Sequence, residues 1–305
     1  MIYTVTLNPA IDYVISVETF EKHKLNSYVF EEYGAGGKGV NVSRLLTSFG
    51  IENTALGFVR GFSGMEIVNK LEQENCLTDF IFLPQGHSRI NIKIQEKNGC
   101  ETDFNGLGTP LPPDAAGQLI GKLSNAGEGD IIILAGSLPK NADENIYAEI
   151  IKWANTRGID CVIDAVNYAL LSTLPHKPFL IKPNHEELGG LFGVKIDNAA
   201  SAKKYAKKLQ LIGARNVVVS LGSEGALFVS EKGKAYFYSA VSGNTVSTVG
   251  AGDSMVAGIL YGLASTKSWD FAMKWGICAG AATAFTKGIA SAAQVTEIYK
   301  REFEN

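Results

Sequence analysis

The chain has 305 residues, of which 46% are hydrophobic and 19% are charged, and its formal net charge is -3. These values are typical of a folded globular enzyme, and they exclude a disordered polyelectrolyte or a disulfide-stapled mini-protein. Because there is no positive excess, and because no run of Lys or Arg is longer than two residues, we expect no nucleic-acid partner.

The cysteines and histidines are scattered along the chain. Cys76, Cys100, Cys161 and Cys278 show no C-x-x-C spacing, and no two histidines have metal-ligand spacing. We therefore predict buried free thiols and no zinc site. The N-terminus lacks a basic leader, and no apolar run approaches the ~20 residues of a membrane span. A cytoplasmic location without a membrane partner is the expectation.

The predicted elements alternate between strand and helix from the first strand, residues 2–7, onward. Short continuous apolar runs occupy residues 130–137, 160–165, 179–184 and 216–222, and helical patterns occupy residues 114–124, 144–156 and 199–211. Runs of this kind are typical of strands buried on both faces of a parallel sheet. The last long segment, residues 251–285, has helical spacing. This order predicts an α/β fold with a doubly wound, mostly parallel sheet flanked by helices, and ligand sites at the carboxyl ends of its strands.

Two regions depart from that order. Residues 12–33 and 89–104 alternate over short stretches, as strands with one solvated face do. They predict a small β-sheet lid inserted within one domain, residues 1–305, because no single cut separates them from the rest. A second copy could cover the edge strands of the lid, so a homodimer through the lid is an open alternative to a monomer.

The strongest local motif is TVGAGDS at residues 248–254, which leads directly into a helical pattern. Gly250 and Gly252 allow the backbone to approach a ligand closely, and backbone N–H groups at a helix start bind negative charge. A carboxylate beside such a site repels an anion, so its presence there suggests a catalytic role. We predict that Asp253 accepts the proton of an attacking hydroxyl. The alternative is that Asp253 only complements the helix N-terminus.

A second glycine-rich loop, GAGGKGVNVS at residues 34–43, also precedes a helical pattern, at residues 40–48. It contains G-x-G-x-x-G, but the segment before it belongs to the lid rather than to a buried parallel strand, which argues against a dinucleotide site. It is not a Walker A loop, because Gly39 follows Lys38 where Ser or Thr would bind magnesium. Lys38 and Asn41 remain as donors suited to sugar hydroxyls or a phosphate.

These two loops, together with LNPAID at residues 7–12, KPNHEE at residues 182–187 and SLGSEGA at residues 220–226, resemble the ribokinase-like (phosphofructokinase-B) carbohydrate kinases. The resemblance covers the whole chain in order and is strongest to the branch of bacterial 1-phosphofructokinases and tagatose-6-phosphate kinases. It implies a β-sheet lid over a bound sugar, with ATP and Mg²⁺ on the far side of the GAGD loop.

The resemblance also implies a role for each matching residue. Asp253 corresponds to the catalytic base, and the anion hole corresponds to Gly250, Ala251 and Gly252. Sugar-contacting positions correspond to Asp12, Gly36, Gly37, Lys38 and Asn41. Arg89 corresponds to the residue that grips the phosphate already on the sugar, for which a planar guanidinium is suited.

On the nucleotide side, Asn184 and Glu187 match an N-x-x-E element that organises magnesium and phosphate through water. The positions that match nucleotide contacts are Lys182, Asn184, Ser220, Gly222 and Gly225. Simpler alternatives exist: Arg89 as a solvated lid charge, Glu187 as a helix-surface residue, and Gly225 as a turn. One departure from the family pattern is Asn26-Ser27, where Asn-Arg is common, so that one phosphate-binding arginine is missing unless Lys24 or Lys38 replaces it.

The function that follows is phosphorylation of a ketohexose monophosphate, with ATP as donor and a sugar phosphate as the other ligand. A ketohexose carries a primary hydroxyl at each end, so fructose 1-phosphate, tagatose 6-phosphate and fructose 6-phosphate all present one free CH₂OH. We favour 1-phosphofructokinase, with tagatose-6-phosphate kinase as the alternative. A 6-phosphofructokinase, a ribokinase or nucleoside kinase, a non-catalytic sugar-phosphate sensor and an NAD-dependent oxidoreductase are weaker hypotheses.

Overall fold

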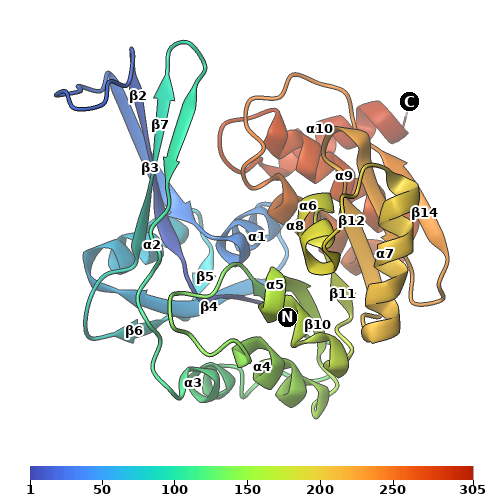
Figure 1. The fold of residues 1–305 in the computed structure, drawn as a ribbon. Coiled ribbons are helices and arrows are strands. Elements are labelled where there is room, and N and C mark those ends of the chain that lie inside the picture. The colour runs from blue at the N-terminus through green and yellow to red at the C-terminus, as the bar shows by residue number, and fades with distance from the viewer. Residues whose placement is uncertain (305) are drawn as a thin grey trace.

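The structure, a computed structural model, describes residues 1–304 as an α/β body from which a small second sheet projects (Figure 1). The main sheet has ten strands. In spatial order they are β14 (Ala235–Ser239), β13 (Gly225–Val229), β12 (Asn216–Ser220), β11 (Leu180–Ile181), β10 (Asp160–Asp164), β9 (Ile131–Ala135), β1 (Ile2–Thr6), β4 (Asn53–Arg60) and β5 (Leu77–Thr78), with β6 (Ile81–Leu83) paired to β4.

All pairings in this sheet are parallel except those of β12 with β13 and of β13 with β14. Alternate residues of the central strands enter different clusters of the core: Ile132 and Leu134 of β9 pack on one face, whereas Ile133 and Ala135 pack on the other. Both faces are therefore dry, which explains the continuous apolar runs. The predicted mostly parallel α/β fold is confirmed.

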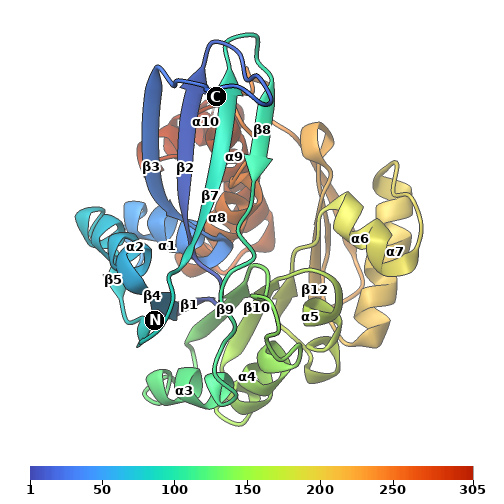
Figure 2. The same ribbon diagram turned by 60° about the vertical axis from the view of Figure 1, so that its left-hand side comes forward.

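Helices cover both faces of the main sheet (Figure 2). One face carries α3 (Ala115–Lys122), α4 (Ile146–Asn155), α5 (Asn167–Leu171), α6 (His185–Phe192) and α7 (Ala199–Ile212). The other face carries α1 (Lys38–Ser48), α2 (Gly61–Gln73), α8 (Ala251–Thr266), α9 (Trp269–Ala284) and α10 (Ala292–Phe303). Two 3₁₀ turns complete the fold, at Leu174–His176 and Gly222–Glu224. None of the helices in residues 1–304 is both long and apolar enough to cross a membrane.

The small sheet, called the lid sheet below, has the strand order β3 (Phe30–Gly36), β2 (Ala10–Val17), β7 (Arg89–Glu96) and β8 (Glu101–Phe104). It contains both regions of short alternation. Its first two strands, however, begin at Ala10 and end at Gly36, beyond the predicted bounds at residues 12 and 33. The first glycines of the second glycine-rich loop therefore belong to a lid strand, and α1 begins two residues later. The loop thus joins the lid sheet directly to a helix of the main body.

Several expected boundaries differ from the structure. The segment at residues 251–285 has the helical structure that its spacing predicts, divided into two helices, because Lys267 adopts a left-handed conformation with φ 56° and ends α8 before Ser268 caps α9. The strand expected at residues 179–184 is only two residues long, since Pro183 and the start of α6 follow at once. All four cysteines are free, and three are buried, but Cys100 is exposed in the turn between β7 and β8, where the prediction of a buried thiol was wrong.

Candidate active site

The first element of the site is the N-terminus of α8. Gly250 caps this helix with φ 79°, a left-handed conformation that favours glycine, and a Cβ there would lie 2.5 Å from Ile289 Cδ1. Ser254 N donates to Gly250 O at 2.9 Å. Ala251 N donates to Thr248 O at 3.2 Å, whereas the N–H groups of Gly252 and Asp253 precede the first intrahelical bond and present partial positive charge. The start of α8 therefore leaves backbone N–H groups open to a ligand, and the anion site expected at Gly250, Ala251 and Gly252 stays a prediction.

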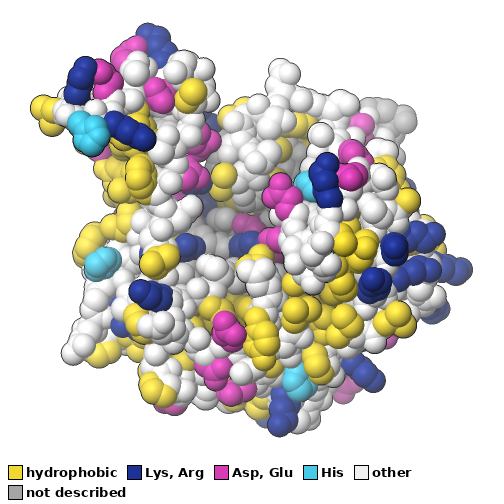
Figure 3. Space-filling view, in the orientation of Figure 1, with side chains coloured by type: hydrophobic (Ala, Val, Ile, Leu, Met, Phe, Trp, Pro, Cys, Tyr) yellow, Lys and Arg dark blue, Asp and Glu magenta, His cyan; other side chains and the backbone are white. Residues whose placement is uncertain are grey.

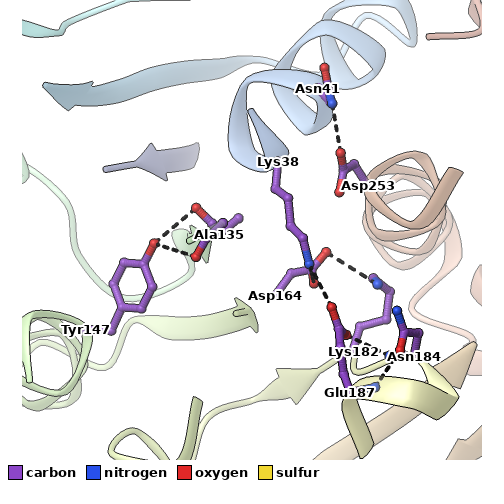
Figure 4. A network of polar contacts seen from close by, with 10 residues as sticks. Lys38, Asn41, Ala135, Tyr147, Asp164, Lys182, Asn184, Glu187 and Asp253 are labelled. Carbon is purple, nitrogen blue, oxygen red and sulfur yellow. Dashed lines mark hydrogen bonds and ion pairs between the residues drawn. The ribbon is translucent and has the colours of Figure 1, made fainter. Parts of the chain in front are cut away.

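Asp253 lies in the first turn of α8 and is only 6% exposed. Its Oδ2 accepts a hydrogen bond of 2.8 Å from Asn41 Nδ2 (Figure 4), and this bond, rather than a structural ion pair, is its side-chain contact. Burial, and then the negative charge of Asp164, raise the pKa of Asp253 to about 7, against the opposing effect of the Asn41 hydrogen bond. A carboxylate with a raised pKa beside an anion site is suited to accept a proton near neutral pH.

The second element is the loop from Gly36 to the start of α1. Gly37 is the N-cap of α1 and has φ 118°. A Cβ at Gly36 would lie 2.2 Å from Asp12 Oδ2. Asp12 also accepts a hydrogen bond of 2.7 Å from Asn91 Nδ2, across β2 and β7. Because Gly36 has no side chain, the Asp12 carboxylate has room beside it at the base of the lid sheet. Asn41 lies one turn into α1.

Below Asp253 lies a cluster of four charges (Figure 4). Lys38 Nζ lies 2.9 Å from Asp164 Oδ1 and 3.4 Å from Glu187 Oε1, and Lys182 Nζ lies 3.4 Å from Asp164 Oδ2. We call these residues, Lys38, Asp164, Lys182 and Glu187, the charge cluster. Lys182 Nζ also lies beside the anion site, since a Cβ at Gly252 would be 3.0 Å from it.

The charges of this cluster hold one another ionised. Burial by itself would lower the pKa of Lys38, but Asp164 and Glu187 outweigh it and hold this pKa above its ordinary value. Burial would likewise raise the pKa of Asp164, but Lys182 and Lys38 outweigh it and hold the pKa of this carboxyl below its ordinary value. Asp164 thus remains an anion although its side chain is fully buried.

Asp164 is a site residue that the sequence motifs do not identify. It is the last residue of β10, between apolar residues, and its partners lie on α1 and before α6. The available signal was a charged residue at the carboxyl end of a buried parallel strand, where ligand sites of such sheets occur. The run at residues 160–165 contains that signal, although its apolar pattern by itself predicts only a strand.

Asn184 and Glu187 form a capping box at the start of α6. Asn184 Oδ1 accepts from Glu187 N at 2.7 Å, and Glu187 Oε2 accepts from Asn184 N at 2.8 Å. This leaves Glu187 Oε1 directed at Lys38. The N-x-x-E spacing therefore has a structural role in capping the helix, and the same bonds fix the orientation of the Glu187 carboxylate.

Ser220 is the last residue of β12, and Gly222 and Gly225 follow it. Ser220 forms a parallel bridge with Asn184, which places this end of the sheet next to α6. Gly222 and Gly225 both have positive φ, 59° and 117°, and a Cβ at Gly225 would lie 2.0 Å from Tyr238 O. The expected turn at Gly225 is thus also the start of β13, and glycine is required there because β14 approaches closely.

Arg89 lies apart from the charge cluster, at the start of β7. Its Nε donates to Asn8 O at 3.0 Å and its Nη1 to Gly106 O at 3.4 Å, and burial lowers its pKa below the ordinary value. The guanidinium is therefore partly buried and holds two loops together, so the alternative of a freely solvated lid charge was wrong. Asn26 and Lys24 interact within their own loop, where Lys24 pairs with Glu21.

A cleft of about 510 Å³ separates the lid sheet from the main body, where the segments 246–249 and 287–289 face it. Asp12 and Asn41 line this cleft. Figure 3 shows the hollow between the lid sheet and the main body, with both basic and acidic side chains in it. A second cleft, of about 420 Å³, lies beyond α6, and the predicted site residues do not line it. The fold thus joins Asn41, which lines the first cleft, to Asp253. It brings Lys38, Lys182 and Glu187 together around Asp164 in the charge cluster.

Comparisons with known proteins agree with this geometry. Residues 5–295 match the model of the pfkB family carbohydrate kinases. The chain is 41% identical over 287 residues to 1-phosphofructokinase of Bacillus subtilis (strain 168), and the aligned region covers 94% of this chain and 93% of that protein. It is 34% identical to D-tagatose-1-phosphate kinase of Bacillus licheniformis, over 97% of each chain. Phosphofructokinase-2 from Escherichia coli, solved in complex with fructose-6-phosphate, superposes with a TM-score of 0.90 at 28% identity over 98% of each chain.

The mostly parallel α/β sheet and the small second sheet define the class of protein as a carbohydrate kinase with a ribokinase-like fold. The chain belongs to the pfkB family of carbohydrate kinases. The resemblance on which the sequence analysis rested is thereby confirmed, and the dinucleotide-binding reading of the second glycine loop is wrong, because that loop joins a lid strand to α1.

Proposed function

We propose that this protein is a 1-phosphofructokinase, which transfers the γ-phosphoryl group of ATP to the free CH₂OH of fructose 1-phosphate. The observation that carries the proposal is the position of Asp253, a buried carboxylate with a raised pKa, next to the backbone N–H groups at the start of α8. The 41% identity to 1-phosphofructokinase of Bacillus subtilis supports the choice of sugar.

The reaction that this geometry supports is an in-line displacement. The 6-hydroxyl oxygen of the sugar forms a bond to the γ-phosphorus, the bond from this phosphorus to the β–γ bridging oxygen breaks, and ADP leaves. The proton of the hydroxyl passes to Asp253. Backbone N–H groups at Gly250, Ala251 and Gly252 neutralise charge on the transferred group, so that deprotonation and charge stabilisation occur at the same helix terminus.

ATP and Mg²⁺ are the proposed co-substrate and metal. Asp164 and Glu187 supply carboxylate oxygens. Asp164 Oδ2 is buried and accepts no hydrogen bond from residues 1–304, although Lys182 Nζ forms an ion pair with it at 3.4 Å. Because magnesium is commonly bound through one or two carboxylates together with substrate phosphates, this donor set fits it. When bound, Mg²⁺ would neutralise charge on the β- and γ-phosphates. Lys182, Ser220, Gly222 and Gly225 would contact the nucleotide.

We propose that the sugar phosphate binds in the cleft beneath the lid sheet. Asp12 and Asn41 line this cleft and would bind sugar hydroxyls, with Gly36, Gly37 and Lys38 beside them. Arg89 would hold the phosphate that the sugar already carries, because its guanidinium has further N–H donors beyond those that bond Asn8 O and Gly106 O. Closure of the lid would exclude water as a competing acceptor.

A tagatose phosphate is the second candidate substrate. It is favoured by the 34% identity to D-tagatose-1-phosphate kinase of Bacillus licheniformis over 97% of each chain. Tagatose and fructose differ only in the configuration at C4, so the same carboxylate and amide side chains could bind both sugars. The discrimination between them depends on a single hydroxyl, for which a buried hydrogen-bonding partner would be required.

We also propose that the lid sheet forms a homodimer interface. Tyr33, Tyr13, Ile92 and Phe104 form one cross-strand row on the same face of this sheet. Of these, Tyr33, Ile92 and Phe104 are exposed. A contiguous apolar row on a sheet that is open to solvent is typical of a surface covered by another chain. A second copy would supply an identical row, as a two-fold interface requires.

A comparative assay tests the proposed function. The purified protein is mixed with ATP and Mg²⁺ and with one acceptor at a time: fructose 1-phosphate, tagatose 1-phosphate, tagatose 6-phosphate, fructose 6-phosphate or ribose, while ADP release is followed. The proposal predicts the highest kcat/KM for fructose 1-phosphate. Faster turnover of a tagatose phosphate would favour the second candidate. Preference for unphosphorylated ribose, or no ADP release with any sugar phosphate, would contradict both.

A further inference from the structure

The ammonium group of Lys38 lies between two carboxylates from different parts of the chain. Lys38 begins α1, Asp164 ends β10, and Glu187 lies in the first turn of α6. Lys38 Nζ is 2.9 Å from Asp164 Oδ1 and 3.4 Å from Glu187 Oε1 (Figure 4). A positive charge within reach of two carboxylates occupies the place where a cation shared by both carboxylates would lie.

The charge cluster is balanced as it stands. Two ammonium groups, on Lys38 and Lys182, face two carboxylates, on Asp164 and Glu187. A divalent cation added to these four groups would leave two unbalanced positive charges at a site where one carboxylate is fully buried. Uncompensated charge is costly in such surroundings, so entry of the cation requires either that an ammonium leaves or that anions arrive with the cation.

The two lysines differ in how readily their ammonium groups can move from the carboxylates into solvent. The side chain of Lys182 is 4% exposed, whereas that of Lys38 is 30% exposed. A lysine stem of four carbons can carry its ammonium into solvent at small cost when the side chain is already partly exposed. Lys182 has no such route, because it is enclosed between Asp164 and the first turn of α8. Lys38 is therefore the group that can be exchanged.

We propose that the Lys38 ammonium is the resident counter-ion of the Asp164 and Glu187 carboxylates in the nucleotide-free protein, and that it leaves when a divalent cation enters with the nucleotide phosphates. This inference rests on the proposed function, since the metal–nucleotide complex is its co-substrate. It follows that a divalent cation alone binds weakly, because it must displace Lys38 without an accompanying anion. The phosphates of the nucleotide supply the missing negative charge, so metal and nucleotide bind cooperatively.

Binding of Mn²⁺ to the nucleotide-free protein tests this exchange. The free Mn²⁺ is measured by electron paramagnetic resonance for the wild type and for Lys38→Met, which keeps the side-chain length without the charge. We expect Lys38→Met to bind Mn²⁺ about 10- to 100-fold more tightly, the range over which neighbouring groups change metal affinity. Lys38→Arg, which keeps the charge, is the matched control and should bind as weakly as the wild type. Equal affinity of the wild type and Lys38→Met would overturn the proposal.

A double variant shows whether the gain comes from the proposed carboxylates. Adding Glu187→Gln to Lys38→Met should remove most of the increase in Mn²⁺ affinity, because one of the two carboxylates is neutralised. An unchanged affinity in the double variant would place the cation elsewhere and contradict the proposal. Circular dichroism spectra and melting temperatures verify that each variant is folded before its affinity is interpreted.

A measurement on the wild type covers the case in which Lys38→Met does not fold. Lysine side chains are acylated with acetic anhydride in the presence and absence of MgCl₂, and the modified peptides are quantified by mass spectrometry. Lys38 should react faster when Mg²⁺ is present, while Lys182 stays protected, and no change at Lys38 at saturating Mg²⁺ would refute the exchange.

None of these readouts depends on the sugar. Failure here with intact kinase turnover would reject only the exchange, whereas absent turnover with all acceptors would reject the proposed function.

Discussion

Asn41 and Asp253, 212 residues apart in the sequence, are joined by a hydrogen bond of 2.8 Å from Asn41 Nδ2 to Asp253 Oδ2. Asn41 lies in the first turns of α1, which follows the lid sheet, and Asp253 lies in the first turn of α8, beside the anion site. The bond therefore links the proposed sugar side of the site to the proposed base. It also favours the ionised form of a carboxyl that burial disfavours.

Substitution Asp253→Asn tests the proposed base. Asparagine has the same shape and can still accept from Asn41, so the fold and the binding of both substrates should persist. Because the amide cannot take the proton of the attacking hydroxyl, kcat should fall by about 10²- to 10⁴-fold, with little change in the Kd values for sugar and nucleotide. Steady-state kinetics and calorimetric binding provide the measurements. Near-normal turnover would remove Asp253 from the reaction.

Substitution Asn41→Ala should shift the pH dependence of the reaction. Without the Asn41 donor, the ionised carboxylate loses a stabilising hydrogen bond, so the pKa of Asp253 rises further. Since the base must be ionised, the acid limb of the kcat/KM profile should move to higher pH, and activity lost at neutral pH should partly return at alkaline pH. A shift of one pH unit corresponds to about a tenfold loss on the acid limb.

Ser43→Ala is the matched control for that profile. Ser43 lies on the same helix and is also buried, but its hydroxyl bonds to Thr4 Oγ1 at 2.6 Å rather than to Asp253. It should lower the melting temperature without moving the acid limb. If Asn41→Ala and Ser43→Ala changed the profile equally, the effect would be one of helix packing and the assigned hydrogen bond would not tune the base.

Asp253→Asn should also change the dependence of stability on pH. The folded-state pKa of Asp253 lies above its ordinary value, at about 7. Its contribution to stability is therefore full below the ordinary carboxyl pKa and is lost as the pH rises through the folded-state pKa. Asparagine is neutral throughout. The melting temperature of the variant should exceed that of the wild type most above the folded-state pKa, and the difference should shrink toward acidic pH; a difference independent of pH would contradict the buried, proton-binding carboxyl.

Gly36→Ala should weaken sugar binding through Asp12. The added Cβ would lie 2.2 Å from Asp12 Oδ2, so the carboxylate must turn away from its present position. We expect the KM for the sugar phosphate to rise by about tenfold, the effect of losing roughly one charge-assisted hydrogen bond, while the KM for ATP stays unchanged. Gly34→Ala is the matched control, because nothing lies within 4 Å of its added Cβ. Equal effects of the two substitutions would show that Asp12 does not bind the sugar.

Ile92→Asp should dissociate the proposed dimer. Ile92 is 40% exposed within the apolar row of the lid sheet, and a buried unpaired carboxylate at a two-fold interface would face its own copy. Light scattering should show a mass of one chain for the variant and of two chains for the wild type. Leu211→Asp, at an 88% exposed position on α7, is the control and should leave the mass unchanged. A monomeric wild type would refute the interface.

Much of the fold could be predicted because it follows from local composition. Strands buried on both faces need continuous apolar runs, and β9, β10 and β12 have them. The break between α8 and α9 was not predictable in this way, because Lys267 is an ordinary residue for a helix and its left-handed conformation depends on the packing of both helices. Likewise, the short strand β11 is limited by the start of α6 rather than by a lack of apolar residues.

The sequence by itself determined the motifs whose chemistry is local: glycines at a helix start, the carboxylate of Asp253 within that motif, and the N-x-x-E spacing that caps α6. Only the tertiary structure decided the rest of the site, because those contacts join residues that no local pattern relates. Asp164 meets Lys38 across 126 positions of the chain. The strength of that ion pair, like the raised pKa of Asp253, comes from burial, and burial exists only once the sheet and both helix layers have packed.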